Sequence, residues 1–162
     1  MKEENYENRG YFTEEELNDV APPEQIIKEK SVPMIECIQE IPCNVCLDSC
    51  KFGAIKKAHI NDPPKIEWEK CCSCLLCVRL CPGLAIFMLS LKDGKAQITI
   101  PWEMQYIPTV GETVNVLNRK GEKIGVGTIV QVASPIKNNK TYLITFETDK
   151  SLLMKARNIR RK

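Results

Sequence analysis

The sequence predicts an α+β protein in which a cysteine-rich domain precedes a small antiparallel β-barrel. All nine cysteines lie between Cys37 and Cys81, and eight of them stand at metal-ligand spacings. Two stretches of this region repeat one another, whereas beyond Pro101 the cysteines stop and alternating apolar strands begin. These changes divide the chain into a lead-in segment (1–32), a cysteine-rich domain (33–101) and a barrel with a basic tail (102–162).

The lead-in segment is expected to form two short helical turns. Thr13 and Glu16 fit a capping box that opens a helix through Val20, and Pro22 stops it. A second turn is expected over residues 23–28. Neither turn is long enough to be stable alone, so we expect both to pack on a neighbouring surface or on a partner.

The strongest motif runs from Cys71 to Pro82. Its cysteines follow the pattern C-x2-C-x2-C-x3-C-P, with ligand positions at Cys71, Cys74, Cys77 and Cys81. In bacterial ferredoxins this pattern holds [4Fe–4S] clusters, because three short loops make the first three thiolates converge on one cube while the fourth leaves on a helix. The pattern therefore predicts an iron–sulfur site.

An earlier group repeats the last three positions of that pattern, with Cys43, Cys46 and Cys50. Glu40 occupies the position of the first cysteine, and Cys37 stands three residues further upstream. A longer loop can bring Cys37 in as a ligand. The alternative is a buried structural thiol on the strand predicted over Val32–Ile38.

The remaining pattern predicts strands joined by turns. Two hairpins are expected in the cysteine-rich domain, one from Lys56–Ile60 with Lys65–Trp68 and one from Ile86–Leu91 with Ala96–Ile100. Further strands are expected over Thr113–Leu117, Ile124–Val132 and Thr141–Phe146. We interpret residues 102–157 as a compact barrel of the SH3-like kind.

Two family resemblances rest on these motifs. Residues 33–91 resemble a bacterial two-[4Fe–4S] ferredoxin, so the first domain is expected to have that fold. The whole chain resembles the small iron–sulfur subunit of FAD-dependent amino-acid dehydrogenase or oxidase complexes of the proline and hydroxyproline type. The appended barrel carries this second resemblance, together with the segments Pro22–Glu24, Ile35–Cys37, Ile41–Cys46 and Cys81–Ile86.

The resemblance implies two [4Fe–4S] clusters, with the fourth cysteine of each run crossing to the other cluster. Carried over by position, cluster I is held by Cys37, Cys43, Cys46 and Cys81. Cluster II is held by Cys50, Cys71, Cys74 and Cys77. Cys72 is left over and is expected to be a buried spare thiol.

The resemblance also implies an electron-transfer subunit, which relays electrons between a flavin on a partner dehydrogenase subunit and a downstream acceptor. The chain shows no catalytic constellation of its own: His59 is its single histidine, and no glycine-rich phosphate loop is present. Lys51 stands where the family tends to have proline. It is expected either near cluster II, where its charge would raise the reduction potential, or in solvent.

Composition leaves alternatives open. Residues 119–162 carry eleven bases against three acids, which admits a nucleic-acid-binding module with stacking by Trp102, Tyr106, Tyr142 and Phe146. A zinc protein using Cys43 and Cys46 with Cys71 and Cys74 is a further alternative. The polar N-terminus, Met1–Arg9, and the lack of a long apolar run favour a cytoplasmic location without a membrane span, where disulfides are rare.

Overall fold

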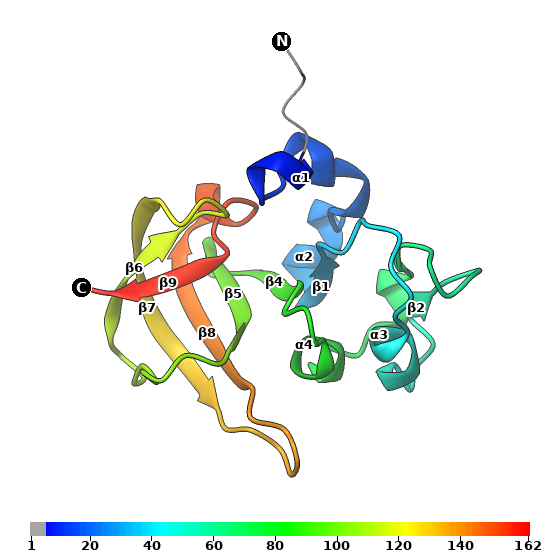
Figure 1. Cartoon of the computed structure of the whole chain (residues 1–162). Helices are drawn as coiled ribbons and strands as arrows, with labels where there is room; N and C mark the ends of the chain where they lie inside the picture. The colour runs from blue at the N-terminus through cyan, green and yellow to red at the C-terminus, as the bar shows by residue number, and fades with distance from the viewer. Residues whose placement is uncertain (1–5) are drawn as a thin grey trace.

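The computed structural model describes residues 6–162 as a curved antiparallel sheet with short helices beside it (Figure 1). The helices are α1 (Tyr6–Arg9), α2 (Glu24–Glu29), α3 (Val45–Ser49) and α4 (Leu76–Leu80), with 3₁₀ turns η1 (Glu15–Val20), η2 (Trp68–Lys70) and η3 (Lys150–Leu152). The strands are β1 (Val32–Ile35), β2 (Ile55–Lys56), β3 (Lys65–Ile66), β4 (Ile86–Lys92), β5 (Lys95–Trp102), β6 (Thr113–Leu117), β7 (Lys123–Ala133), β8 (Tyr142–Asp149) and β9 (Asn158–Arg161). Of the polar N-terminal stretch Met1–Arg9, residues 1–5 lie outside the described part of the chain.

Seven strands form a single open sheet in the order β1-β4-β5-β8-β7-β6-β9, while β2 pairs with β3 in a small sheet of its own. The predicted fold class, a ferredoxin-like α+β domain followed by a separate SH3-like barrel, is therefore wrong. The sheet has β1 and β9 as its edge strands, so it is not closed. It also runs from the cysteine-rich half of the chain into the C-terminal half without a break (Figure 1).

Strand β5 joins the two halves. It pairs with β4 on one side, and along its whole length with β8 on the other, from Lys95 opposite Asp149 to Trp102 opposite Tyr142. Ile98 of β5 is fully buried beside its β8 partner. Alternation of apolar residues shows that a segment is a strand, but it does not show on how many edges the strand is paired.

Most predicted elements are confirmed at the level of local structure. Strand β6 has the predicted bounds, and the β4–β5 hairpin turns at Asp93 and Gly94, whose φ angles of 52° and 78° suit a tight two-residue turn. The capping box is present: the Thr13 N–H donates to Glu16 Oε2 at 2.8 Å, and the Glu16 N–H donates to Thr13 Oγ1 at 3.3 Å. Strand β9 was not predicted, because its two arginines are typical of a solvent-exposed basic tail.

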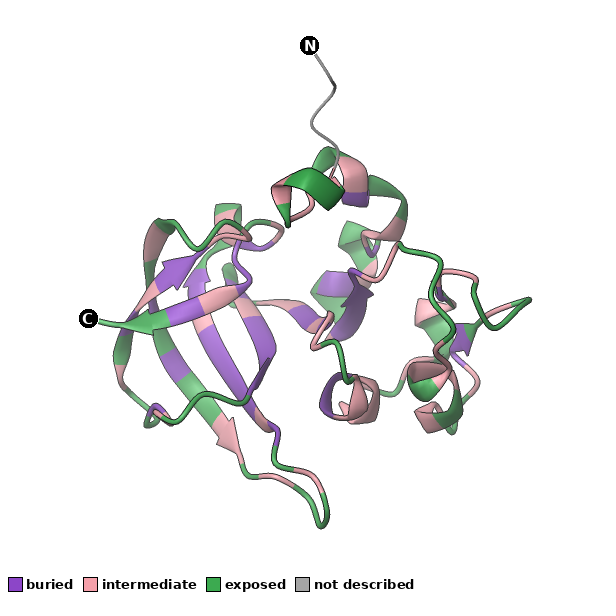
Figure 2. Cartoon of the chain, in the orientation of Figure 1, coloured by how far each residue is buried: buried purple, intermediate pink, exposed green. Residues whose placement is uncertain are grey.

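The lead-in segment packs on the sheet, and its core residues are Leu17 of η1 and Ile27 of α2, which are 1% and 3% exposed. A second, smaller core lies beneath the cysteine loops. It combines residues of both halves of the chain, namely Ile35, Ile55, Val78, Ile86, Met88 and Leu143. Figure 2 shows buried residues along the sheet and mainly intermediate or exposed residues in the loops around α3 and α4.

A buried ion cluster ties the end of β1 to the C-terminal half. Arg119 clamps the Glu36 carboxylate with two hydrogen bonds, from Nε to Oε2 at 2.8 Å and from Nη2 to Oε1 at 2.6 Å. Arg157 donates to the same carboxylate and lies over the ring of Phe87. Glu36 directly precedes Cys37, so this cluster anchors the first cysteine loop to the sheet.

Candidate metal centres

Cysteines from both runs converge on two cavities. Group I lines a cavity of about 190 Å³ and consists of Cys37, Cys43, Cys46 and Cys81. A second, smaller cavity is lined by five cysteines, namely Cys72 and the four that we call group II, Cys50, Cys71, Cys74 and Cys77. Group I and group II are the two sets that the family resemblance implies for clusters I and II, and Cys37 lies with the first set.

The pairing of β1 with β4 explains why Cys37 meets Cys81. The ladder ends with Ile35 opposite Ile86 and continues through a hydrogen bond from the Glu36 N–H to the Ala85 carbonyl at 2.8 Å. Cys37 leaves the end of β1 where the Cys81 loop enters β4. Two cysteines that are far apart in the sequence are therefore held at one end of the sheet.

The small β2–β3 sheet does the same for group II. Ile55 pairs with Ile66, and the Glu67 N–H donates to the Ala54 carbonyl at 2.8 Å. Cys50 precedes this ladder and Cys71 follows it, so an antiparallel pairing places both at the same end. In the sequence, the β2–β3 pairing lies inside the β1–β4 pairing. Cys81 of the second run therefore joins the first run in group I, and Cys50 of the first run joins the second run in group II.

The loop that carries Cys71, Cys74 and Cys77 curls tightly. Ser73 and Leu75 have positive φ angles of 60° and 66°, which are uncommon for residues other than glycine. The Ser73 hydroxyl donates to the Ser31 carbonyl, and this hydrogen bond attaches the loop to the lead-in segment. The curl lets thiols at two-residue spacing face one cavity.

Backbone N–H groups donate to three sulfur atoms of the two groups. Ala54 donates to Cys50 Sγ at 3.3 Å, Ser73 to Cys71 Sγ at 3.4 Å, and Ala85 to Cys81 Sγ at 3.5 Å. Hydrogen bonds of this kind favour the thiolate over the thiol and tune the potential of iron–sulfur clusters. Both cavities therefore have backbone N–H groups that donate to cysteine sulfur, as well as the thiols themselves.

Negative charge on one thiol of a group raises the pKa of the neighbouring thiols. Burial raises the pKa of Cys77 to about 12, and the neighbouring thiols Cys71, Cys74 and Cys50 add to the rise. Burial also raises the pKa of Cys37, with further contributions from Cys81 and Cys43. A metal centre that binds thiolates would supply the missing positive charge.

A single metal ion and a cluster require different spacings of the thiols. Among residues 6–162, no three Cys, His, Asp or Glu side chains converge closely enough to hold one metal ion. A tetrahedral zinc needs four sulfurs about 2.3 Å from one point. In a [4Fe–4S] cube each thiolate would bind a different iron, so the four sulfurs would stand further apart than they do around one ion.

Cys72 is exposed in the structure, so the prediction of a buried spare thiol is wrong. Cys72 lines the group II cavity together with the four thiols of that group, and Cys74 is exposed as well. Cys72 is left out of group II because it breaks the two-residue spacing of Cys71, Cys74 and Cys77. Replacement Cys72→Ser should leave the iron content unchanged, whereas Cys74→Ser should remove about four irons per chain. Iron and acid-labile sulfide assays on the two anaerobically purified variants test this, and loss of iron from the Cys72 variant would contradict the assignment.

Two half-buried lysines donate to the cysteine loops, and nothing in the sequence pointed to them. Lys57 Nζ donates to the Cys43 carbonyl at 2.7 Å, and Lys30 Nζ donates to the Cys71 carbonyl at 2.8 Å. These partners are 14 and 41 residues apart in the chain, so no local spacing reveals them. Lys51, for which a place near cluster II was one of two expectations, is exposed to solvent.

Arg79 braces the helix that links the two groups. It lies on α4, between Cys77 of group II and Cys81 of group I, and is 8% exposed. Its guanidinium donates to the carbonyls of Ser134 and Thr141, both at 2.9 Å, in the connection between β7 and β8. These two hydrogen bonds fix α4 to the C-terminal half of the chain.

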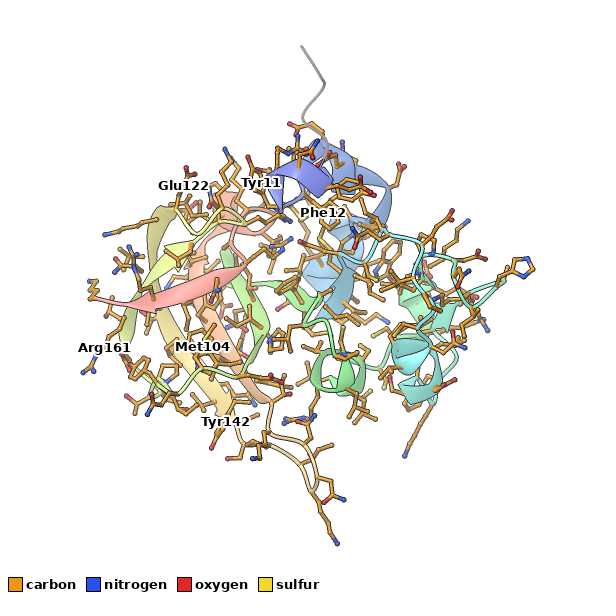
Figure 3. All side chains as sticks on the ribbon, in the orientation of Figure 1. Tyr11, Phe12, Met104, Glu122, Tyr142 and Arg161 are labelled. Atoms are coloured by element: carbon orange, nitrogen blue, oxygen red, sulfur yellow. The ribbon has the colours of Figure 1, made fainter. Side chains whose placement is uncertain are left out.

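The aromatic side chains on which the nucleic-acid alternative depends are buried or half-buried. Trp102 and Phe146 are buried in the core, and Tyr106 is half-buried with its ring under the Arg161 guanidinium at 5.1 Å. Arg161 lies in the C-terminal half, away from α3 and the cysteine loops (Figure 3). Tyr142 is half-buried at the start of β8, so none of the four aromatic side chains named for stacking on bases is fully exposed.

Comparisons of the chain with family models, curated proteins and solved structures found no match. Within residues 6–162 no helix has both the length and the apolar character needed to cross a bilayer.

Proposed function

We propose that the chain is an electron-transfer protein that holds two [4Fe–4S] clusters, one in each cysteine group. In this proposal it relays electrons between a flavin site on a partner dehydrogenase subunit and a downstream acceptor. The observation that carries the proposal is the convergence of eight cysteines, from two sequence runs, into two groups of four. The flavin-containing partner and a cytoplasmic location rest on the sequence alone, through the family resemblance and the composition.

The residues of the chain have distinct roles in this proposal. The eight cysteines hold the clusters, which supply one-electron redox chemistry when bound. The backbone N–H groups of Ala54, Ser73 and Ala85 stabilise the thiolate ligands. With four thiols for each cluster, every iron has a protein ligand and none is left open for a substrate, so the chemical transformation belongs to another chain.

Metal analysis of the anaerobically purified chain tests the proposal. We expect about eight irons and eight sulfides per chain, and two interacting signals in the EPR spectrum after dithionite reduction. Zinc without iron would contradict the proposal in favour of a structural zinc protein. Affinity for nucleic acid that falls steeply with salt, in a protein without iron, would favour the nucleic-acid alternative.

The partner is tested separately, with the tagged chain isolated from its natural source. We expect a co-purifying chain whose bound chromophore has a flavin spectrum, and whose substrate bleaches both the flavin and the iron–sulfur absorption. Bleaching of the flavin alone would contradict the relay. Replacement Cys46→Ala in the same complex is the control, because it should remove cluster I and interrupt transfer beyond the flavin.

A further inference from the structure

In each cysteine group, the ammonium of one lysine donates hydrogen bonds to backbone carbonyls of a cysteine loop. Lys57 Nζ donates to the carbonyls of Cys43 and Ile60, both at 2.7 Å, and so lies against group I. Lys30 Nζ donates to the carbonyls of Cys71 at 2.8 Å and Glu69 at 3.0 Å, and so lies against group II. Different parts of the chain thus supply equivalent cations to the two groups.

Neither ammonium group forms an ion pair with a described residue. Within residues 6–162 no carboxylate lies within 4.0 Å of either one, so each is paired only with neutral carbonyls. Asp62 borders the same cavity as Lys57, but its Oδ2 accepts from the His59 N–H at 2.8 Å. Half-buried cations of this kind act over a longer range than cations in water.

The field of each lysine reaches its own group. Lys57 contacts the carbonyl of Cys43, a member of group I, and Lys30 contacts the carbonyl of Cys71, a member of group II. A cation at these positions stabilises negative charge at the sulfur ligands, and reduction of a [4Fe–4S] cluster adds one negative charge to the same ligands.

We infer that Lys57 and Lys30 set the reduction potentials of clusters I and II separately, each raising the potential of the cluster it contacts. This inference rests on the proposed function, since it requires both clusters. It gives the lead-in segment a role, because Lys30 directly follows α2, and Ile27 of α2 is buried in the main core. Packing of the lead-in segment on the sheet therefore places the charge of Lys30 beside cluster II.

The test uses single glutamine variants of the cluster-loaded chain. Glutamine removes the charge but keeps an N–H donor for the carbonyls. Lys57→Gln should lower the midpoint potential of one cluster, and Lys30→Gln that of the other, in an EPR-monitored redox titration. We expect a roughly tenfold change in the ratio of reduced to oxidised cluster at fixed potential, which is about 59 mV for a one-electron couple.

Two controls separate charge from structure. Lys51→Gln, at an exposed lysine of the same region, should leave both potentials unchanged. Lys57→Arg and Lys30→Arg keep the charge and should keep potentials close to those of the unchanged protein. A purely structural contact would affect iron content and thermal stability without moving one potential selectively.

Several outcomes would overturn the inference. Full iron with unchanged potentials in both glutamine variants would refute it and leave the proposed function intact. Shifts of the same cluster by both variants would refute the separate assignment, and loss of a cluster from a glutamine variant would make that lysine a structural residue. A protein that binds no iron at all would refute the proposed function as well.

Discussion

Replacing Cys50 and Cys77 together by alanine should leave about four irons per chain, whereas replacing Cys50 and Cys46 together should leave almost none. Cys50 and Cys46 are four residues apart on α3 and its end, yet the structure places them in different groups. Cys50 and Cys77 come from different runs and share one cavity. Residual iron in the double variants therefore reports which cysteines act together.

Each single variant provides the reference for this experiment. Cys50→Ala, Cys46→Ala and Cys77→Ala should each lose about half of the iron, because one cluster is lost in each case. If each run held its own cluster, the pair Cys50 and Cys46 would keep about four irons and the pair Cys50 and Cys77 would keep none. That reversed pattern would refute the crossed arrangement without requiring either cluster to be identified spectroscopically.

Replacement Glu36→Gln should lower the free energy of unfolding by about 3–5 kcal/mol, which corresponds to a fall in Tm of roughly 10 °C. The substitution leaves the buried guanidiniums of Arg119 and Arg157 without their carboxylate, and an unpaired buried charge costs more than the pair contributes. Thermal unfolding followed by circular dichroism under anaerobic conditions measures the change, with iron content checked in the same samples.

Glu24→Gln is the matched control. Glu24 also lies between two cations, Lys28 at 2.9 Å and Lys150 at 3.3 Å, but its side chain is 63% exposed. Exposed pairs contribute little, so this variant should unfold within about 1 kcal/mol of the unchanged protein. Equal Tm values for the Glu36 and Glu24 variants would contradict the structural role of the buried cluster.

The effect of Glu36 should also depend on pH. Burial alone would raise the pKa of this carboxyl, but the hydrogen bonds and charges of Arg119 and Arg157 outweigh it and hold the pKa below its ordinary value of 4.5. A carboxyl whose pKa is lower in the folded state stabilises the fold above its unfolded pKa, and that contribution disappears as the pH falls through the folded pKa. The Tm difference between the unchanged protein and Glu36→Gln should therefore be full at pH 7 and should shrink as the pH falls below the ordinary value of 4.5 and through the lowered pKa of Glu36.

Local elements were predictable where the sequence contains its own turn and capping chemistry. Asp93-Gly94 specifies a two-residue hairpin whatever surrounds it, and the Thr13–Glu16 box is made by residues three positions apart. Strand β9 was missed because its burial comes from Ile159 alone within a run of charged residues. Its pairing with β6, rather than its composition, makes it a strand.

The fold class could not be obtained in the same way. The sequence contains a ferredoxin-like cysteine pattern and a set of later strands, and the prediction treats them as two domains. Which strand edges meet depends on contacts between residues far apart, such as those of β5 with β8. One continuous sheet replaces the two predicted domains because β5 is long and apolar enough to be buried between two partners.

The sequence by itself determined which cysteines stand at ligand spacing, since that spacing is a local property that the chain carries into any fold, while the family resemblance implied how they divide into two sets. It also determined most strands and turns, through alternation and turn residues. Only the tertiary structure decided that the sheet is continuous, that Cys72 is exposed, and that Lys30 and Lys57 rather than Lys51 contact the cysteine loops. The physical reason is that these features depend on long-range pairing, which brings together side chains whose separation along the chain carries no pattern.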